Sequence, residues 1–257
     1  MDLSFEMNFC VVIPARYKST RFPGKPLAKI LGKSLIILVI ENINKIINKD
    51  KIYVATDDER IFKEVTANGF KAIMTSEAAL TGTDRLAEVV EIIDYEIYIN
   101  VQGDEPLINP ADIIECAKLK EKYPNRIING YSFINENENP TSLNIPKTVI
   151  SKENKLLYIS RGLIPSTKKD DNKNIKYKKQ VCIYGFSKND LIKFNTYGSK
   201  SPLEELEDIE IIRFLEMNTH IHMFKCSGNS LAVDVPCDIL KIEEELIKRN
   251  NDSKKIL

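Results

Sequence analysis

The sequence predicts an α/β protein with a mostly parallel central sheet, helices on both faces of that sheet, and a smaller antiparallel insertion. Two observations predict this fold. Short apolar, β-branched runs alternate with segments of helical periodicity in the first half, whereas strand-like runs follow one another without long helices between them after about residue 125. The chain has 257 residues and no internal repeat, so we expect one domain over residues 1–257.

The first half contains four strand patterns, and helix patterns lie between them. The strand patterns are FCVVIP (9–14), KIYVATDD (51–58), KAIMT (71–75) and EIYINVQGDEPLI (96–108). The helix patterns are SLIILVIENINKII (34–47), ERIFKEVTANGF (59–70) and GTDRLAEVVEII (82–93). Because the carboxyl ends of parallel strands meet at one edge of a sheet, we expect a ligand to bind there.

The second half begins with four strand patterns, which predict an antiparallel insertion over residues 126–200. These patterns are IINGYSFIN (127–135), PKTVIS (146–151), KLLYIS (155–160) and QVCIYGFS (180–187). PLEELEDIEIIRFLEMN (202–218) then predicts a single helix with acidic residues in its first turns. IHMFKC (221–226) and LAVDV (231–235) predict late strands, and PCDILKIEEELIKRN (236–250) predicts a final amphipathic helix.

Charge and cysteine content exclude several classes of protein. Lys plus Arg and Asp plus Glu both number 37, so net charge gives no support for binding to nucleic acid or to an anionic membrane. The first residues do not resemble a signal peptide, and no apolar stretch is long enough to cross a membrane. The five cysteines form no CxxC pair, which favours reduced thiols and a cytoplasmic location.

A basic loop follows the first strand pattern. Arg16, Arg21 and Lys25 lie within it, Gly24 gives it conformational freedom, and prolines restrict it elsewhere. Several cations held close together suit a triphosphate, although a solvated surface loop has the same composition. Neither a GxxxxGK[ST] nor a GxGxxG motif is present, so phosphate binding of the P-loop or Rossmann type is not expected.

Carboxylates follow two further strand patterns. In NVQGDEP (100–106), Gly103 permits a close backbone approach, and Asp104 is placed to hold a divalent cation on phosphate oxygens; Glu105 could serve instead. Asp234 lies at the end of the LAVDV pattern. Each segment alone could be an acidic turn, but two carboxylates together with the basic loop predict a site for a metal and a triphosphate.

Several segments resemble the 3-deoxy-manno-octulosonate cytidylyltransferases, also called CMP-Kdo synthetases, in order and spacing. They are IPARYKSTRFPGKPL, ATDDERI, MTSEAALTGTDRLAEVV, IYINVQGDEPLI, LYISRGLIP, CIYGFS, PLEELEDIEIIRFLEMN and VDVPCDI. The resemblance implies a nucleotide-diphospho-sugar transferase-like fold. It also implies transfer of CMP from CTP to an acidic eight-carbon sugar, Kdo, with release of pyrophosphate, for lipopolysaccharide or capsule biosynthesis.

The resemblance also implies roles for particular residues, a magnesium cofactor and a homodimer formed through residues 126–200. Catalysis would depend on Arg16, Arg21, Lys25 and Asp104. The nucleotide would contact Pro14, Ala15, Arg16, Lys25, Thr83, Arg85 and Asp104. The sugar would contact Gln102, Arg161, Gln180, Tyr184 and Glu210, and Mg²⁺ would be held by Asp104 and Asp234.

The chain departs from the family pattern around the expected sugar pocket. Gln180 replaces a His, Cys182 a Gly, Ile211 a Gln and Ala79 a His. Two alternatives therefore stay open: a cytidylyltransferase for a different acidic sugar such as 8-amino-Kdo, and a catalytically silent relative that only binds a sugar nucleotide. Glu210 and Arg213 fall on the inner side of the predicted helix, away from Glu204, and could instead form an ion pair with each other.

Overall fold

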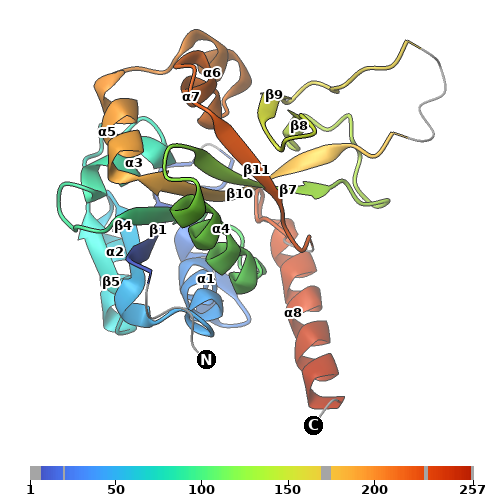
Figure 1. Ribbon diagram of the computed structural model, residues 1–257. Coiled ribbons are helices and arrows are strands. Elements are labelled where there is room, and N and C mark those ends of the chain that lie inside the picture. Colours follow the sequence, from blue (N-terminus) through green and yellow to red (C-terminus); the bar gives the residue numbers. More distant parts are fainter. Residues whose placement is uncertain (1–6, 20, 169–174, 229–230, 256–257) are drawn as a thin grey trace.

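The computed structural model describes residues 7–19, 21–168, 175–228 and 231–255, and within these ranges a nine-stranded sheet forms the centre of the protein (Figure 1). Its main strand order is β11-β7-β10-β6-β1-β4-β5, and β8 and β9 extend from β10. The strands are β1 (Phe9–Ala15), β4 (Ile52–Thr56), β5 (Lys71–Met74), β6 (Ile97–Val101), β7 (Ile127–Phe133), β8 (Lys147–Ile150), β9 (Leu156–Ser160), β10 (Lys178–Ser187) and β11 (Ile221–Lys225). A separate two-stranded sheet pairs β2 (Lys29–Ile30) with β3 (Lys33–Ser34).

The strand directions confirm the predicted fold class. Strand β1 is parallel to both β4 and β6, and β4 is parallel to β5. Strand β10 lies antiparallel between β6 and β7, and β8 pairs antiparallel with β9. Residues 126–200 therefore contribute antiparallel strands to the sheet that the first half begins.

Helices cover both faces of the sheet, as predicted (Figure 1). They are α1 (Leu35–Asn44), α2 (Glu59–Ala67), α3 (Gly82–Val89), α4 (Pro110–Lys122), α5 (Lys188–Thr196), α6 (Pro202–Glu207), α7 (Ile211–Glu216) and α8 (Asp238–Lys255). Val11 and Ile13 of β1 join an apolar cluster with α1, α2, α4 and α8, whereas Cys10 and Val12 join a second cluster with α3, α5 and α7. The alternation along one strand thus supplies two cores. No helix in the described ranges is long and apolar enough to cross a membrane.

Two predicted elements are wrong. Residues 202–218 form two short helices, because Asp208 adopts a left-handed conformation with φ of 49° between α6 and α7. Residues 231–235 form no strand; the amide of Val233 donates one hydrogen bond, of 2.9 Å, to the backbone oxygen of Asp104 in place of a ladder. All five cysteines are free thiols.

Candidate active site

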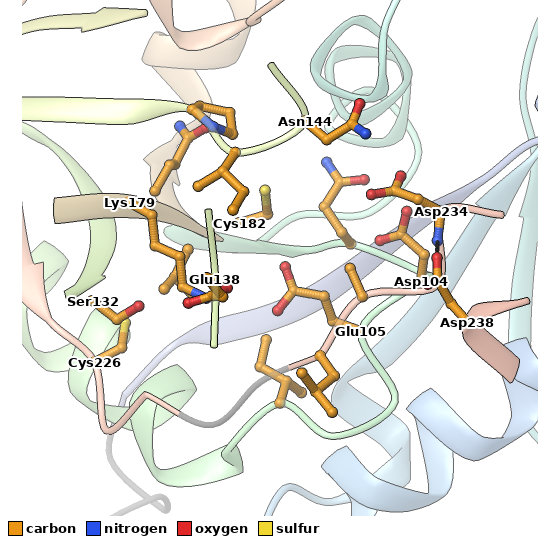
Figure 2. A pocket seen from close by; sticks show the side chains of 18 of the residues that line it. Asp104, Glu105, Ser132, Glu138, Asn144, Lys179, Cys182, Cys226, Asp234 and Asp238 are labelled. Carbon is orange, nitrogen blue, oxygen red and sulfur yellow. Dashed lines mark hydrogen bonds and ion pairs between the residues drawn. The ribbon is translucent and has the colours of Figure 1, made fainter. Parts of the chain in front are cut away.

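A cavity of about 580 Å³, here called the acidic cavity, opens beside the carboxyl end of β6 (Figure 2). Figure 2 shows the carboxylates of Asp104, Asp234 and Asp238 on one side of it, and Lys179 and Cys226 on the other. Its lining includes these predicted site residues: Arg21, Gln102, Asp104, Arg161, Gln180, Tyr184, Glu210 and Asp234. The structure therefore brings together residues that are far apart in the sequence.

A second cavity of about 860 Å³, here called the basic cavity, lies against the loop after β1. It is lined by Arg16, Tyr17, Lys18, Ser19, Arg21, Pro23, Leu143, Asn144, Arg161 and Asp208. Four of these residues, Arg21, Asn144, Arg161 and Asp208, also line the acidic cavity. The two cavities thus share a wall. This wall carries Arg21, which is predicted to bind phosphate, and Arg161, which is predicted to bind the sugar.

The basic loop is held in one conformation by its glycine and its tyrosine. Gly24 has φ of +72°, and a Cβ built on it would lie 3.1 Å from the ring of Tyr17. The amide of Gly24 donates a 2.9 Å hydrogen bond to the Tyr17 carbonyl, and the guanidinium of Arg60 lies 3.3 Å from the centre of the Tyr17 ring. The loop therefore folds back and begins a short 3-10 helix at Lys25.

Two of the loop's cations form ion pairs with the predicted metal ligands. Lys25 Nζ lies 2.6 Å from Asp104 Oδ2 and donates a 2.9 Å hydrogen bond to the Val233 carbonyl. Arg21 lies 3.1 Å from Asp234 Oδ1 and also donates to the side chain of Asn144 at 3.3 Å. These contacts join the loop after β1, the loop after β6 and the segment before α8 into one charged surface.

Arg16 is one of the exposed cations of the loop, and within the described ranges it forms no hydrogen bond or ion pair. It still acts on Asp208 at a distance. A hydrogen bond from Lys200 lowers the pKa of the Asp208 carboxyl, and the charges of Arg161 and Arg16 lower it further. Arg16 is thus available to a ligand in the basic cavity.

The carboxylates of Asp104 and Asp234 fit a cation that is only partly held by protein. Among the residues that the structure describes, no group of three or more His, Cys, Asp or Glu side chains is arranged to hold a metal by itself. Mg²⁺ is commonly bound through one or two carboxylates, with substrate phosphates and water completing its shell. The donor set therefore suits a divalent cation that arrives with a nucleotide better than a permanent protein-only metal site.

Arg161 braces the wall between the cavities. Its guanidinium donates to the backbone oxygens of Glu207 at 2.6 Å, Leu143 at 2.9 Å and Asp208 at 3.0 Å. These bonds leave part of the donor capacity of the guanidinium for a ligand. Its predicted contact with a sugar carboxylate stays a prediction, and the structure adds a bracing role that the sequence did not indicate.

Strand β10 contributes Gln180, Cys182 and Tyr184 to the acidic cavity. Its register against β7 shifts between Val181 and Tyr184, which interrupts the regular pairing there. Gln180 donates a 3.1 Å hydrogen bond to Asn129 Oδ1. Burial raises the pKa of both Tyr184 and Cys182 well above the ordinary values. Both groups therefore stay neutral near pH 7.

Glu210 lines the acidic cavity, but its carboxylate already has partners. It accepts hydrogen bonds from the amides of Gly82 at 3.0 Å and Thr83 at 2.8 Å, and from the Thr83 hydroxyl. Burial raises the pKa of Glu210, and the bonds from Thr83 and Gly82 oppose that shift. Glu210 thus supplies acceptors for the first amides of α3, which have no partner within their own helix.

The possible ion pair between Glu210 and Arg213 is absent, and the placement of Glu204 on the exposed side of the helix is wrong. Arg213 instead binds Glu204 at 2.6 Å and Asp84 at 2.8 Å, and Glu204 is buried. The break at Asp208 turns α6 relative to α7, so a single helical wheel misplaced these side chains.

Four predicted nucleotide-binding residues are buried outside the linings of the two cavities. Pro14 and Ala15 pair with β4, opposite Ala55 and Thr56. Thr83 is engaged by Glu210, and Arg85 donates to Asp57 Oδ2 at 3.0 Å and to the Thr75 hydroxyl. A Cβ on Gly82 would lie 3.2 Å from the Pro14 ring, so the start of α3 packs directly on the end of β1. Their nucleotide contacts stay predictions.

Sequence reasoning missed several cavity residues. Asn144 and Asp208 lie in the shared wall, and Lys179 pairs with Glu138 in the lining of the acidic cavity. Asn144 and Glu138 belong to a segment with neither strand nor helix periodicity, so no pattern pointed to them. The sequence indicated Asp208 only as one of the acidic residues of the single helix expected over residues 202–218.

The fold and this charged surface define a nucleotidyltransferase: cations follow the first strand of a mostly parallel sheet, and a carboxylate after the neighbouring strand β6 pairs with one of them. The comparisons with known proteins agree. The family model described as Cytidylyltransferase matches residues 10–221, and the chain belongs to this family. The resemblance predicted from the sequence is therefore confirmed.

Individual relatives cover nearly the whole chain. A protein of Protochlamydia amoebophila named 3-deoxy-manno-octulosonate cytidylyltransferase is 38% identical and is aligned over 93% of this chain and 94% of its own. A Shewanella protein named 8-amino-3,8-dideoxy-manno-octulosonate cytidylyltransferase is 39% identical and is aligned over 93% of this chain and 99% of its own. The solved structure of a CMP:2-keto-3-deoxy-manno-octonic acid synthetase complexed with CTP matches with a TM-score of 0.85 at 33% identity, covering 94% of this chain and 99% of that one.

Proposed function

We propose that this protein transfers the cytidylyl group of CTP to Kdo, which gives CMP-Kdo and pyrophosphate for lipopolysaccharide or capsule biosynthesis. The observation that carries the proposal is the pairing of Lys25 with Asp104 and of Arg21 with Asp234 at the edge of the acidic cavity. Such a surface offers cations for a triphosphate beside carboxylates for its metal ion. Relatives at 38% and 40% identity carry the Kdo name, which supports Kdo as the sugar.

The chemistry requires positioning and charge stabilisation more than covalent participation by the protein. The anomeric hydroxyl of the sugar attacks the α-phosphorus of CTP, the bond to the β-phosphate oxygen breaks, and pyrophosphate leaves. The hydroxyl proton passes to solvent. Arg16, Arg21 and Lys25 hold the triphosphate and offset the negative charge that spreads over its oxygens.

Asp104 and Asp234 would hold Mg²⁺ against the phosphates in this arrangement. When bound, the ion would supply positive charge at the reacting phosphate and would lower the pKa of an oxygen bound to it. We assign no protein group as general base. Tyr184, the phenol in the acidic cavity, is held in its neutral form because burial raises its pKa.

The sugar would occupy the acidic cavity, among the polar side chains of Gln102, Gln180 and Tyr184. Its carboxylate would face the free donors of Arg161, on the wall next to the basic cavity. This placement puts the acid group of the sugar near the cations that hold the triphosphate.

The test is pyrophosphate release by the purified protein with CTP, Mg²⁺ and each of two sugars, Kdo and 8-amino-Kdo. We expect release with Kdo and a kcat/KM for Kdo at least about tenfold above that for its 8-amino analogue, since one mismatched polar group costs about 1–3 kcal/mol. A preference for the 8-amino sugar would reassign the substrate. A folded protein that releases pyrophosphate with neither sugar would support the silent alternative.

We propose further that residues 126–200 form the interface of a homodimer, in the cytoplasm. Within the described residues β9 pairs as a strand only with β8, the residue before it, Lys155, bridges to His222 of β11, and Leu157 on β9 is exposed. Light scattering after size exclusion tests the dimer. We expect twice the chain mass, and the Leu157→Lys variant should shift the population toward the monomer.

A further inference from the structure

Lys147, the first residue of β8, is a fully buried lysine that contacts the wall shared by the two cavities. Its Nζ donates hydrogen bonds to the Ser142 carbonyl, at 2.8 Å, and to the Arg161 carbonyl. Within the described ranges its ammonium group forms no ion pair. A buried charge without an opposite charge is costly unless its hydrogen bonds are kept, so Lys147 holds these two carbonyls firmly in place.

The two carbonyls belong to two segments that meet in the shared wall. One segment is the turn that contains Ser142 and Leu143, and the Leu143 carbonyl accepts a 2.9 Å hydrogen bond from the Arg161 guanidinium. The other segment is the end of β9, where the Arg161 amide donates a 2.8 Å hydrogen bond to Glu207 Oε2. Lys147 thus joins the turn that receives the guanidinium to the backbone from which that guanidinium extends.

We infer that Lys147 is a positioning residue for the acid group of the sugar, and that it acts through Arg161. It holds the Arg161 backbone and the turn that accepts from the guanidinium, so the remaining donors of that guanidinium keep one direction. A carboxylate is bound best by donors in a fixed planar arrangement, and a small displacement weakens the contact. The inference rests on the proposed function and adds to it a residue that lines neither cavity.

Removal of the ammonium group should weaken binding of the sugar more than binding of the nucleotide. Lys147→Met keeps an unbranched apolar side chain but offers no donor, so we expect the KM for Kdo to rise about tenfold. The change in kcat should be small, because the acid group of the sugar takes no part in the reaction. The KM for CTP should change by about twofold or less, since the turn meets the basic loop only through the 3.3 Å bond from the exposed Arg21 to Asn144.

A double-mutant cycle separates an effect through Arg161 from a general loss of structure. Arg161→Met removes the guanidinium and should itself raise the KM for Kdo. Adding Lys147→Met to this variant should raise that KM by no more than about twofold further, because the group that Lys147 positions is already absent. Independent structural damage would instead multiply the two effects. All KM values are measured by pyrophosphate release with the other substrate saturating.

Lys120→Met is the matched control, because Lys120 is also a buried lysine that binds backbone oxygens. Its Nζ donates 2.8 Å hydrogen bonds to the Pro124 and Arg126 carbonyls. It also donates a 2.7 Å hydrogen bond to Asp190, and it lines neither cavity. Lys120→Met should lower the melting temperature at least as much as Lys147→Met, since it leaves a carboxylate without its partner, but both KM values should stay unchanged.

Lys147→Gln is a milder second variant, which keeps an N–H donor on a side chain that is one atom shorter. It should raise the KM for Kdo less than Lys147→Met does, and it carries the test if the Met variant does not fold by circular dichroism. An unchanged KM for Kdo in a folded Lys147 variant, or effects that multiply with Arg161→Met, overturns the inference. A wild-type protein that releases no pyrophosphate with CTP and either acidic sugar overturns the proposed function itself.

Discussion

Two clusters of ion pairs lie near the same cavity and differ in their access to solvent. Lys25 with Asp104 is a partly exposed pair on the cavity surface. Arg213 is fully buried between α3, α6 and α7, where it binds Asp84 and Glu204 and lies 3.6 Å over the Phe194 ring. Similar residue types thus occur in two settings, at the surface of the site and in the core behind it.

The difference teaches which charges can exchange partners. A phosphate, a metal or water can replace a partner at the cavity surface, so an ion pair there can open without leaving a bare charge. In the core, opening the pair would leave unpaired charges in a poorly solvated interior, which costs several kcal/mol. The surface cluster is therefore suited to binding, and the buried cluster to holding α3 against α6 and α7.

The largest effect is expected at the surface cluster, from Asp104→Ala. Turnover should fall by about 1,000-fold or more, because one proposed ligand of the metal ion at the reacting phosphate is lost. The fold should survive, since Asp104 is a partly exposed loop residue. Steady-state pyrophosphate release and thermal melting measure the two properties. Near-normal turnover by a folded variant would remove Asp104 from the proposed metal site.

In the buried cluster, the variant Arg213→Met should lower stability, whereas Asp104→Ala lowers turnover. Removing the guanidinium leaves Asp84 and Glu204 without their charged partner, so the free energy of unfolding should fall by about 3–5 kcal/mol. Lys29→Met is the control, because Lys29 pairs with Glu64 at an exposed position and should change stability by about 0.5 kcal/mol or less. Urea denaturation measures the free energy of unfolding of both variants. Equal losses in Arg213→Met and Lys29→Met would contradict the distinction between buried and exposed ion pairs.

Glu210 lines the acidic cavity and binds the start of α3, the helix that carries Asp84, and its substitution should have an intermediate effect. A Gln at this position keeps one acceptor oxygen but turns an NH₂ group toward the amides of Gly82 and Thr83. Loss of a helix-end acceptor costs about 1 kcal/mol, so we expect a rise of about fivefold in the KM for CTP. The change in kcat should be small, because the start of α3 packs on Pro14 and not on the reacting groups.

Glu216→Gln is the matched control for Glu210. Glu216 also accepts a backbone hydrogen bond across helices, from Leu203 at 3.2 Å, but it lines neither cavity. It should therefore leave both KM values unchanged. If Glu210→Gln raised the KM for the sugar alone, the predicted direct contact between Glu210 and the sugar would replace the positioning role.

The sequence was sufficient for the features that depend on local pattern. Apolar runs followed by polar loops located β1, β4 and β6, and the order of parallel strands placed Arg21 and Asp104 at the same edge of the sheet. Within the basic loop, Gly24 adopts a positive φ, a conformation that suits glycine.

The rest depends on tertiary contacts that one-dimensional periodicity does not carry. A single residue with positive φ, Asp208, divided the helix expected over 202–218, and Glu204 then moved to a buried partner. Helix α4 was not assigned from the sequence, and its buried Lys120 donates a hydrogen bond to Asp190, far along the chain. Asn144 entered the shared wall only through the folding of an irregular segment.

The smallest effect is expected from Lys200→Met. Lys200 lies 3.0 Å from Asp208, and their side chains are 25% and 73% exposed, so the free energy of unfolding near pH 7 should fall by only about 0–1 kcal/mol. The hydrogen bond from Lys200 lowers the pKa of Asp208 in the folded state. The stability that this hydrogen bond contributes is therefore fully present above the pKa of Asp208 in the unfolded state. It is lost as the pH falls through the lower pKa of the folded state.

Salt provides the sharper check on this pair. High ionic strength screens exposed charges, so the difference between Lys200→Met and wild type should shrink toward zero in 1 M NaCl. The loss in Arg213→Met should persist in the same salt, because bulk ions do not reach the buried guanidinium. Urea denaturation of both variants at low and high salt measures this. A salt-insensitive loss in Lys200→Met would mean that Asp208 acts with the buried cluster, and that exposure alone does not separate the charges that can exchange from those that cannot.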